Sequence, residues 1–378
     1  MNQRKILFII ESMGGGGAER SAHSIASSLT KDFIVEFLLL NNAWNYSKIN
    51  NIKVSVISSV NLIVQIVAIA HHIKKTKPDM VVSVLPSAAL RVLVIRRLCR
   101  SLNFRWIVRL ATVYTKQQKN HNLITKIRNK FFEQISNYAD RILIISEESK
   151  SDLITNLSFK PNKITVIANG TDKQKIITNS IEPIETPLSF KEIPLIISAG
   201  RMSEEKNHSL LISAFNEVQK QKACRLALLG NGPLRDDLRK QAKNLNLGGS
   251  VILLPFQKNP WKYIAAADVF VLPSIYEGYP NILIEAMLCK TPIITTNWGA
   301  GLAEITMGKE VCVTVEKNNP MEMSKAILTL LNNPAYADKL RQQAFQHAMK
   351  NLYDIKDAVR LYETEIKTVL NDAEKRHD

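Results

Sequence analysis

With 378 residues and 46% hydrophobic content, the chain is long enough for two or three domains with ordinary apolar cores. Its four cysteines lack C-x-x-C spacing, so neither a zinc site nor a disulfide framework is indicated, and no apolar run reaches the roughly 18 residues of a membrane-spanning helix. The net charge of +16 is concentrated in residues 1–185, where 26 basic residues stand against 13 acidic ones, so we expect a polyanionic partner unless this is only a solvated surface.

Short apolar runs rich in β-branched residues, most of them followed by a helical pattern, recur along the first half of the chain. They lie at residues 5–10, 33–40, 53–58, 78–85, 105–111, 141–146 and 164–169. Strands that alternate with helices are typical of parallel sheets wound by βα units. Residues 1–184 are therefore predicted to form one Rossmann-like domain.

Four consecutive glycines, residues 14–17, stand between the first apolar run and the helical pattern that follows it. Glycine lets the backbone approach a ligand closely, and the free N–H groups at a helix start attract anions. The spacing matches neither G-x-x-x-x-G-K-S/T nor a clean G-x-G-x-x-G, which disfavours a P-loop ATPase and weakens a dinucleotide-binding fold. A flexible surface loop is the alternative to a phosphate-binding loop.

The stretch from residue 80 to 132 carries eleven basic residues and no acidic one. Its alternation of apolar and basic residues between Ala88 and Trp106 is typical of an amphipathic helix. Such a helix either touches lipid headgroups or packs on a sheet with its arginines in water. We expect Arg96, Arg97 and Arg100 to contact an anionic membrane surface. Aromatic residues are not interleaved as in single-strand binders, which disfavours a nucleic-acid partner.

Residues 180–194 contain three prolines and no regular period, which predicts a linker. Strand and helix patterns then restart, and they predict a second Rossmann-like domain over residues 185–354. A last amphipathic helix, at about 355–378, is expected to pack back on the first domain. Two open α/β sheets bind ligands at the carboxyl ends of their strands, so the loops at these ends are the candidates for a site.

Basic residues and glycines follow the first two strands of the second half. Arg201 offers a planar fork and Lys206 a point charge, and together they suit a diphosphate, although ordinary surface charge is the alternative. Gly230 and Gly232 end the next strand, where a flat base would lie against bare backbone.

Two glutamates eight residues apart mark the most informative loop of the second half. Glu277 lies in a loop, where its carboxylate can accept hydrogen bonds from sugar hydroxyls, or can simply complement a helix dipole. Glu285 lies among apolar residues of the next helix, where an unpaired carboxylate would be costly, so a ribose with two hydroxyls is a fitting partner. Backbone amides of the turn at 278–281 point at the cleft and suit a phosphate.

Six motifs in this order resemble the retaining glycosyltransferases of family 4, which have the GT-B fold. They are GGGGAER at 14–20, ISEESKSDL at 145–153, ANGTD at 168–172, GRMSEEKN at 200–207, GNGP at 230–233 and EGYPNILIEA at 277–286. The Glu-x7-Glu spacing from Glu277 to Glu285 is that family's own signature. The resemblance covers most of the chain and implies two doubly wound Rossmann-like domains that face each other across a cleft.

The resemblance implies a nucleotide-sugar donor, most often UDP-linked, and transfer that retains the anomeric configuration without a metal ion or cofactor. It assigns the diphosphate to Arg201 and Lys206, the transferred sugar to Glu277 and the ribose to Glu285. The other donor-binding residues that it implies are Gly15, Gly16, Gly17, Gly200, Gly230, Gly278, Tyr279, Pro280, Asn281 and Ile282.

On the acceptor side, many relatives have a histidine after the middle strand of the first domain, whereas RWIVRLATVYTK at 105–116 has none. The candidates for that side of the cleft are Glu19, Arg109, Thr112 and Ser146. The basic first half favours a glycan acceptor linked to a polyprenyl diphosphate at an anionic leaflet. We therefore expect a cytoplasmic protein, peripheral on the inner face of the cell membrane, that works in bacterial surface polysaccharide or glycan assembly.

Three other functions stay open at this point. A nucleotide-sugar epimerase of the same fold would act without an acceptor. A non-catalytic partner subunit is expected to lack the basic pair or the glutamates, and here both are present. A nucleic-acid-binding protein would leave Glu277 and Glu285 unexplained.

Overall fold

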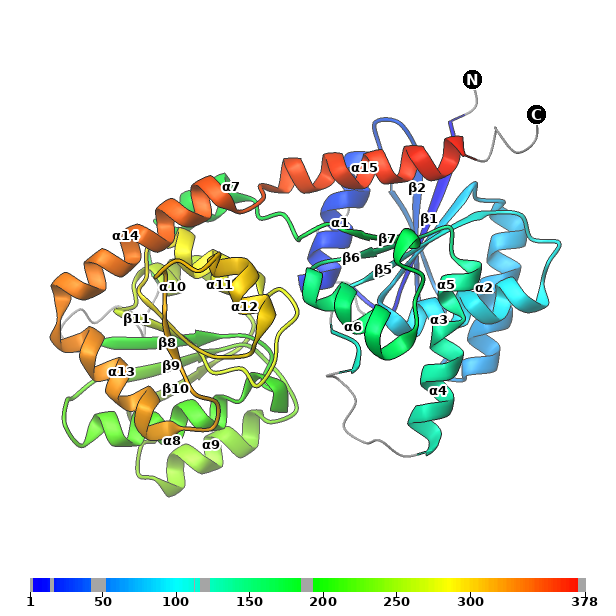
Figure 1. The fold of residues 1–378 in the computed structure, drawn as a ribbon. Coiled ribbons are helices and arrows are strands. Elements are labelled where there is room, and N and C mark those ends of the chain that lie inside the picture. The colour runs from blue at the N-terminus through cyan, green and yellow to red at the C-terminus, as the bar shows by residue number, and fades with distance from the viewer. Residues whose placement is uncertain are drawn as a thin grey trace. The chain divides into compact units, whose positions relative to one another are not determined.

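The computed structural model describes residues 3–13, 17–41, 52–111, 113–115, 123–184 and 193–372. The chain forms two compact units, unit 1 with Met1–Gly170 and Ile355–Asp378, and unit 2 with Thr171–Asp354 (Figure 1). The predicted division lay at residue 184, whereas the structure divides the chain at Gly170. The intervening helix, α7 (Lys173–Ser180), packs on two helices of unit 2, α10 and α11. Most of the predicted linker, residues 185–192, lies outside the described residues.

Unit 1 is built on a parallel sheet of seven strands in the order β3-β2-β1-β4-β5-β6-β7. Its elements are β1 (Lys5–Ile10), α1 (Gly17–Leu29), β2 (Ile34–Leu39), β3 (Ile52–Val56), α2 (Leu62–Thr76), β4 (Met80–Val84), α3 (Leu85–Leu98), β5 (Arg105–Leu110), α4 (Leu123–Glu133), α5 (Ile135–Tyr138), β6 (Arg141–Ile144), α6 (Glu147–Leu157), the 3-10 turn η2 (Pro161–Lys163), β7 (Ile164–Val166) and α15 (Ile355–Asn371). This is the parallel sheet that the alternation of apolar runs and helices predicts.

Both faces of the unit 1 sheet are covered, because successive side chains of a strand point to opposite faces. Along β1, Leu7 and Ile9 join a buried cluster with residues of α2, α3, α4, α5 and α6. Phe8 and Ile10 join a second buried cluster with α1 and α15. The last helix therefore closes the core of the first unit, with Tyr362 among its buried residues.

Unit 2 is built on a parallel sheet of six strands in the order β10-β9-β8-β11-β12-β13. Its elements besides α7 are β8 (Leu195–Ala199), the 3-10 turn η3 (Glu204–Lys206), α8 (His208–Gln219), β9 (Arg225–Leu229), α9 (Arg235–Asn244), β10 (Val251–Leu254), α10 (Trp261–Ala265), β11 (Val269–Leu272), α11 (Asn281–Leu288), β12 (Ile293–Thr296), α12 (Ala300–Thr306), β13 (Val313–Val315), α13 (Pro320–Asn332) and α14 (Pro334–Asn351). After α11 the chain turns at the exposed Lys290, whose φ of 55° lies in the left-handed region that favours glycine.

The strand order reverses once in each sheet, between β1 and β4 in unit 1 and between β8 and β11 in unit 2. Open parallel sheets bind ligands at the carboxyl ends of the strands next to such a reversal. The loops after β8 and β11 are therefore the first place to look for a site in unit 2. Within the described ranges, no helix has both the length and the apolar composition needed to cross a bilayer.

Candidate active site

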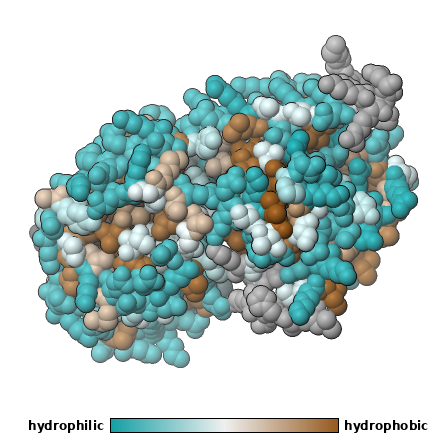
Figure 2. Space-filling model, in the orientation of Figure 1, coloured by the Kyte–Doolittle hydropathy of each residue, from teal (hydrophilic) through white to brown (hydrophobic). Residues whose placement is uncertain are grey.

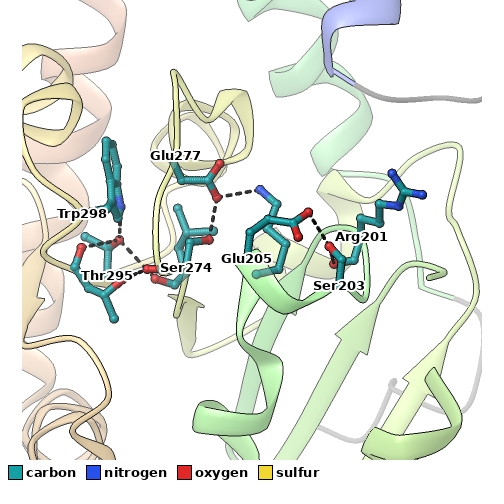
Figure 3. Close-up of polar contacts among 10 residues, drawn as sticks. Arg201, Ser203, Glu205, Ser274, Glu277, Thr295 and Trp298 are labelled. Carbon is teal, nitrogen blue, oxygen red and sulfur yellow. Dashed lines mark hydrogen bonds and ion pairs between the residues drawn. The ribbon is translucent and has the colours of Figure 1, made fainter. Parts of the chain in front are cut away.

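A partly buried ion pair joins the two loops at the strand reversal of unit 2. Lys206, in η3 after β8, places its Nζ atom 2.6 Å from Oε1 of Glu277, in the loop after β11. The two side chains are only 20% and 10% exposed, so solvent screens their attraction less than that of a surface pair. The sequence singled out both residues separately, and the structure brings them into contact. Figure 3 draws this contact as a dashed line from Glu277.

A hydroxyl group just after β11 also contacts Glu277, and a second hydroxyl, at the end of β12, supports the first. Ser274 is fully buried and donates from Oγ to the same Oε1 atom over 2.5 Å. The backbone of Ser274 is fixed in turn, because Thr296 donates from Oγ1 to its carbonyl oxygen. The carboxylate of Glu277 therefore has one oxygen saturated by Lys206 and Ser274. Sequence reasoning assigned no role to Ser274, although its place three residues before Glu277 at a strand end was a usable signal.

Arg201, the other member of the predicted basic pair, does not join this ion pair. It is exposed, and in Figure 3 its guanidinium lies on the far side of Ser203 and Glu205 from Glu277. The loop that carries it is well fixed, since Ser203 donates to Glu205 over 2.5 Å and the carbonyl of Glu205 accepts from the amide of Ile275. A ligand that engages both cations must therefore extend along this loop, as a diphosphate would.

Glu285, the second glutamate of the signature, is buried in α11, and it has a partner there. Trp261, the first residue of α10, donates from Nε1 to Oε2 of Glu285 over 2.7 Å. Glu285 is 4% exposed and Trp261 is 6% exposed. Burial and the neighbouring Glu285 both raise the pKa of the Cys289 thiol, which also contacts the carbonyl of Trp261. Nothing in the local sequence identified Trp261, which lies 24 residues before Glu285.

The turn between the two glutamates leads directly into α11. Tyr279 is buried, and burial raises the pKa of its hydroxyl. Pro280 caps the helix, so α11 begins at Asn281 and continues through Ile282. Within the described residues, the Oδ1 atom of Asn281 is buried without a hydrogen-bond partner, which marks it as a polar group that a ligand can satisfy. Gly278 is half-buried in the same turn.

The two glycines after β9 are required by packing, whereas the glycine after β8 is not. Gly230 has a φ of 142°, and a Cβ atom there would lie 2.0 Å from the carbonyl oxygen of Gly200. A Cβ atom at Gly232 would lie 2.2 Å from the carbonyl oxygen of Met202. A Cβ atom at Gly200 would lie 3.7 Å from the Lys206 side chain, an ordinary van der Waals distance, so packing does not require a glycine there. The close approach of two loops therefore explains Gly230 and Gly232. The sequence had suggested a different reason, a bare backbone surface for a flat base.

In unit 1, the predicted residues separate into different roles. Glu19, in the first turn of α1, accepts from the Ser12 hydroxyl over 2.8 Å at the carboxyl end of β1. Ser146 is fully buried and caps α6 by accepting from the amide of Ser149, so its role in the structure is to begin that helix. Gly17 is the first residue of α1. The predicted residues Gly15, Gly16 and Thr112 lie outside the described residues.

Arg109, expected where relatives have a histidine, is turned into the interior of unit 1 and is 1% exposed. Its guanidinium donates to the Tyr362 hydroxyl, to Ser21 and to Asn169 over 2.8–3.1 Å, and to the carbonyl of Ala18 over 3.3 Å. Such a residue ties α1 and α15 to the end of β5 rather than contacting a sugar. The expectation that Arg109 faces the substrate does not fit this placement.

Within the described residues, no group of three or more His, Cys, Asp and Glu side chains is arranged to hold a metal ion. His208, next to the basic loop, is fully buried at the start of α8, and burial together with the nearby Lys206 lowers its pKa to about 4. It is therefore a neutral residue of the interior at pH 7.

Comparison with known proteins gives consistent matches over the whole chain. Residues 15–175 match the family described as "Glycosyltransferase Family 4", and residues 181–347 match "Glycosyl transferases group 1". A Campylobacter jejuni protein named N-acetylgalactosamine-N,N'-diacetylbacillosaminyl-diphospho-undecaprenol 4-alpha-N-acetylgalactosaminyltransferase is 28% identical, over 97% of this chain and 100% of that protein. The amylovoran biosynthesis glycosyltransferase AmsD of Erwinia amylovora is 24% identical, over 93% of this chain and 95% of its own.

Among solved structures, Anabaena Alr3699/HepE in complex with UDP and glucose superimposes with a TM-score of 0.80 at 18% identity, covering 96% of this chain and 99% of that one. The matched proteins named by activity are glycosyltransferases, so the epimerase alternative is not favoured. With its two Rossmann-like units and these matches, the chain belongs to the family 4 glycosyltransferases of the GT-B fold.

Proposed function

We propose that this glycosyltransferase moves a sugar from a UDP-sugar to a glycan carried on a polyprenyl diphosphate. The observation that carries the donor half of this proposal is the convergence of Lys206, Glu277 and Ser274 at the strand reversal of unit 2. A cation and a carboxylate in contact at that edge can receive the two ends of a sugar phosphate. The UDP found in the HepE structures supports UDP as the donor nucleotide.

In this proposal the cations act on the leaving group. Lys206 and Arg201 bind the diphosphate and stabilise the negative charge that grows on it as the bond to the sugar breaks. The amides at the start of α11 add donors at the same place. Because the basic residues take this role, the reaction needs no metal ion or cofactor.

The glutamates hold the two ends of the donor. Glu285, oriented by Trp261, accepts hydrogen bonds from the ribose hydroxyls, and Glu277, oriented by Ser274, accepts from hydroxyls of the transferred sugar. Asn281 offers its unpartnered Oδ1 atom to a hydroxyl of the same ligand.

The transfer retains the anomeric configuration, in keeping with the family that the chain resembles. The bond from the anomeric carbon to the distal phosphate oxygen breaks, and its electron pair leaves with UDP. The acceptor hydroxyl attacks on the same face, and its proton passes to the leaving phosphate. In this scheme Glu277 is a sugar-binding group and not a nucleophile, and its Oε1 atom accepts from Lys206 and Ser274 in the structure.

The acceptor half rests on the relative that matches the whole chain, whose name specifies an undecaprenol diphosphate carrier. The acid-free basic stretch of the first half suits an anionic leaflet, where such a carrier would be found. We place the enzyme on the inner face of the cell membrane, where UDP-sugars are available.

A donor screen followed by an acceptor screen tests the proposal. Release of UDP from a panel of UDP-sugars identifies the donor, and defined polyprenyl-diphosphate glycans then serve as acceptors. We expect transfer to a lipid-linked glycan with an α-linked product from an α-linked donor, read by NMR. Interconversion of the UDP-sugar without an acceptor, or transfer with inversion, would contradict the proposal.

A further inference from the structure

The start of helix α2 in unit 1 exposes an unusual run of aliphatic side chains. Val60 is fully exposed, at 103%, and Leu62, Ile63, Val64 and Val67 are 54%, 72%, 50% and 63% exposed. Single exposed aliphatic residues are normal, but several within eight positions form a contiguous patch of the kind that marks an interaction site. We call residues 60–67 the α2 patch.

The α2 patch is presented by a firmly seated helix. Asn61 caps α2, and its side chain accepts from the amides of Ile63 and Val64. On the opposite face Gln65 is buried, where it donates to the carbonyls of Leu40 and Ser59. The aliphatic face is therefore held outward by a helix whose polar contacts are satisfied, and it is not the frayed end of a loose segment.

The topology of unit 1 fixes which edge of the sheet carries the patch. All strands are parallel and α2 connects β3 to β4, so its first turn lies at the carboxyl edge and its last turn at the amino edge. The start of α1, which follows β1 and begins at Gly17, lies at the same carboxyl edge, with Glu19 in its first turn. The patch thus shares an edge with the residues predicted for the acceptor side.

By the same topology, the arginines that the sequence favoured for membrane contact lie at the other edge. α3 begins directly after β4 and ends with Arg96 and Arg97, close to the amino end of β5. Arg96 lies 4.8 Å from the Phe104 ring and Arg97 lies 5.9 Å from the Phe131 ring, so both pack against aromatic residues of their own unit. Arg97 and Arg100 are also exposed, so the expected lipid contact through these arginines stays a prediction, at the other edge from the α2 patch.

The charge on this face of unit 1 helps to select the kind of partner that the patch binds. α2 contains no acidic residue, and none occurs from residue 80 to 132. α4, which covers the same face of the sheet as α2, exposes Lys126, Arg128 and Lys130 around Ile127, itself 62% exposed. Aliphatic side chains among cations suit the interface of an anionic bilayer, whereas two copies of this cationic face would repel each other.

We propose that the α2 patch inserts into the headgroup region of an anionic bilayer while the cations of α4 contact lipid phosphates. In Figure 2 most of the visible surface is hydrophilic, and brown hydrophobic atoms are visible at the rim of unit 1 where Figure 1 draws α2, as well as nearer the middle of that unit. The inference rests on the proposed lipid-linked acceptor for its purpose, because docking through this edge brings the acceptor side of unit 1 to the membrane. It adds the surface that makes the contact.

Vesicle binding without donor or acceptor tests the inference independently of catalysis. The variant is the double substitution Ile63→Gln with Val67→Gln, and the matched control is Leu98→Gln, which alters an equally aliphatic side chain, 77% exposed, at the end of α3. Vesicles of phosphatidylcholine with phosphatidylglycerol serve as the anionic probe, and phosphatidylcholine alone as the neutral one. Unchanged thermal unfolding of both variants confirms that they fold.

We expect the wild-type protein and Leu98→Gln to sediment with anionic vesicles, and the double variant to partition about tenfold or more weakly, since it loses two apolar side chains from the contact. Changing Lys126 and Lys130 to glutamate should weaken binding mainly at low salt. A tryptophan at position 63 should shift its emission to the blue with anionic vesicles and be quenched by brominated lipid. Equal partitioning of the wild type and the double variant would overturn the inference. So would a wild-type dimer that the double variant turns into a monomer, because the patch would then bind a second copy.

The outcomes separate this inference from the proposed function. If the patch governs vesicle binding but no polyprenyl-linked glycan is an acceptor, the proposed acceptor is wrong and the membrane contact stands. If lipid-linked transfer is found but the double variant binds vesicles and transfers sugar in them like the wild type, the α2 patch is not the contact.

Discussion

The ion pair between Lys206 and Glu277 predicts opposite effects on nucleotide binding from its two members. Lys206 is engaged by Glu277, so a diphosphate must compete for the same ammonium group. Removing the negative charge by Glu277→Gln frees Lys206 and should tighten UDP binding. Removing the cation by Lys206→Ala should weaken it. An arrangement in which both residues simply add contacts to UDP predicts weakening in both variants.

The magnitude follows from the geometry. Two unit charges 2.6 Å apart at an effective dielectric constant of about 20 attract each other by about 6 kcal/mol, and desolvation of a pair that is mostly buried offsets most of this. A net of about 1–2 kcal/mol is therefore released when the competitor is neutralised, which corresponds to UDP binding about 5–30-fold tighter. A charge-assisted hydrogen bond to phosphate contributes about 1.5–3 kcal/mol, so Lys206→Ala should bind UDP about 10–150-fold more weakly.

Calorimetric titration with UDP and with UMP measures both effects. UMP lacks the distal phosphate, so the differences among wild type, Lys206→Ala and Glu277→Gln should shrink with it. Lys220→Ala, which breaks the exposed pair with Glu217 in the same unit, is the matched control and should leave UDP affinity unchanged. Sugar transfer by Glu277→Gln should still fall about 100-fold or more, because the sugar loses a charged acceptor. If Glu277→Gln weakens UDP binding as Lys206→Ala does, the idea of competition is wrong.

Four further outcomes are expected. Arg201→Ala should raise the activation free energy of sugar transfer by about 2–4 kcal/mol. Because the Arg201 side chain is exposed, the variant should be as stable as the wild type. A near-wild-type transfer rate would show that Arg201 does not belong to the site. Glu285→Ala should weaken UDP binding itself. Trp261→Phe removes a 2.7 Å hydrogen bond to the Glu285 carboxylate and should weaken UDP binding by about 1.5–3 kcal/mol. An unchanged UDP affinity, measured by calorimetry in a folded Glu285→Ala variant, would make Glu285 a structural residue. Transfer should persist in EDTA, and a loss that magnesium or manganese restores would contradict a metal-independent site. The pKa of His208 is lowered to about 4 in the folded state, so the unfolded chain binds the proton at a higher pH than the folded chain does. The free energy of unfolding should therefore fall as the pH drops from about 6.5 towards 4. If a His208→Gln variant shows the same fall, His208 is not its cause.

The fold could be predicted from the sequence to a large extent, because its strands are short apolar runs rich in β-branched residues. β1 and β8 are completely or nearly completely buried, and each is followed by a loop and an amphipathic helix. The weaker elements were not predicted individually. β13 has three residues with a partly exposed pattern, and α12 has seven residues, so neither gives a clear period. The division at Gly170 was also missed, since α7 belongs to unit 2 through its packing and not through its composition.

The candidate site was predictable where a residue sits in a strand-end loop. Glu277 and Lys206 were identified in this way, and only the structure shows that they touch. Trp261 was missed because its contact with Glu285 depends on how α10 packs against α11, which local sequence does not encode. Arg109 was misplaced for a related reason. A strand-end arginine points either to a ligand or inward, and the acceptors that turn it inward, Tyr362 among them, come from distant parts of the chain.

The return of α15 to unit 1 reverses the order in which the two halves can be completed during synthesis. Unit 2 is one continuous stretch, 171–354, whereas unit 1 needs residues from both ends of the chain. At about 5–20 residues per second, about 10–40 seconds pass between the end of the first stretch and the appearance of the last helix. During that time the apolar cluster that contains Phe8 of β1 and Ile25 of α1 lacks Tyr362 and Ile366 of α15, which complete it. Unit 1, which is synthesised first, is thus the last to complete its core. Its exposed apolar face is the surface that a chaperone would bind in the meantime.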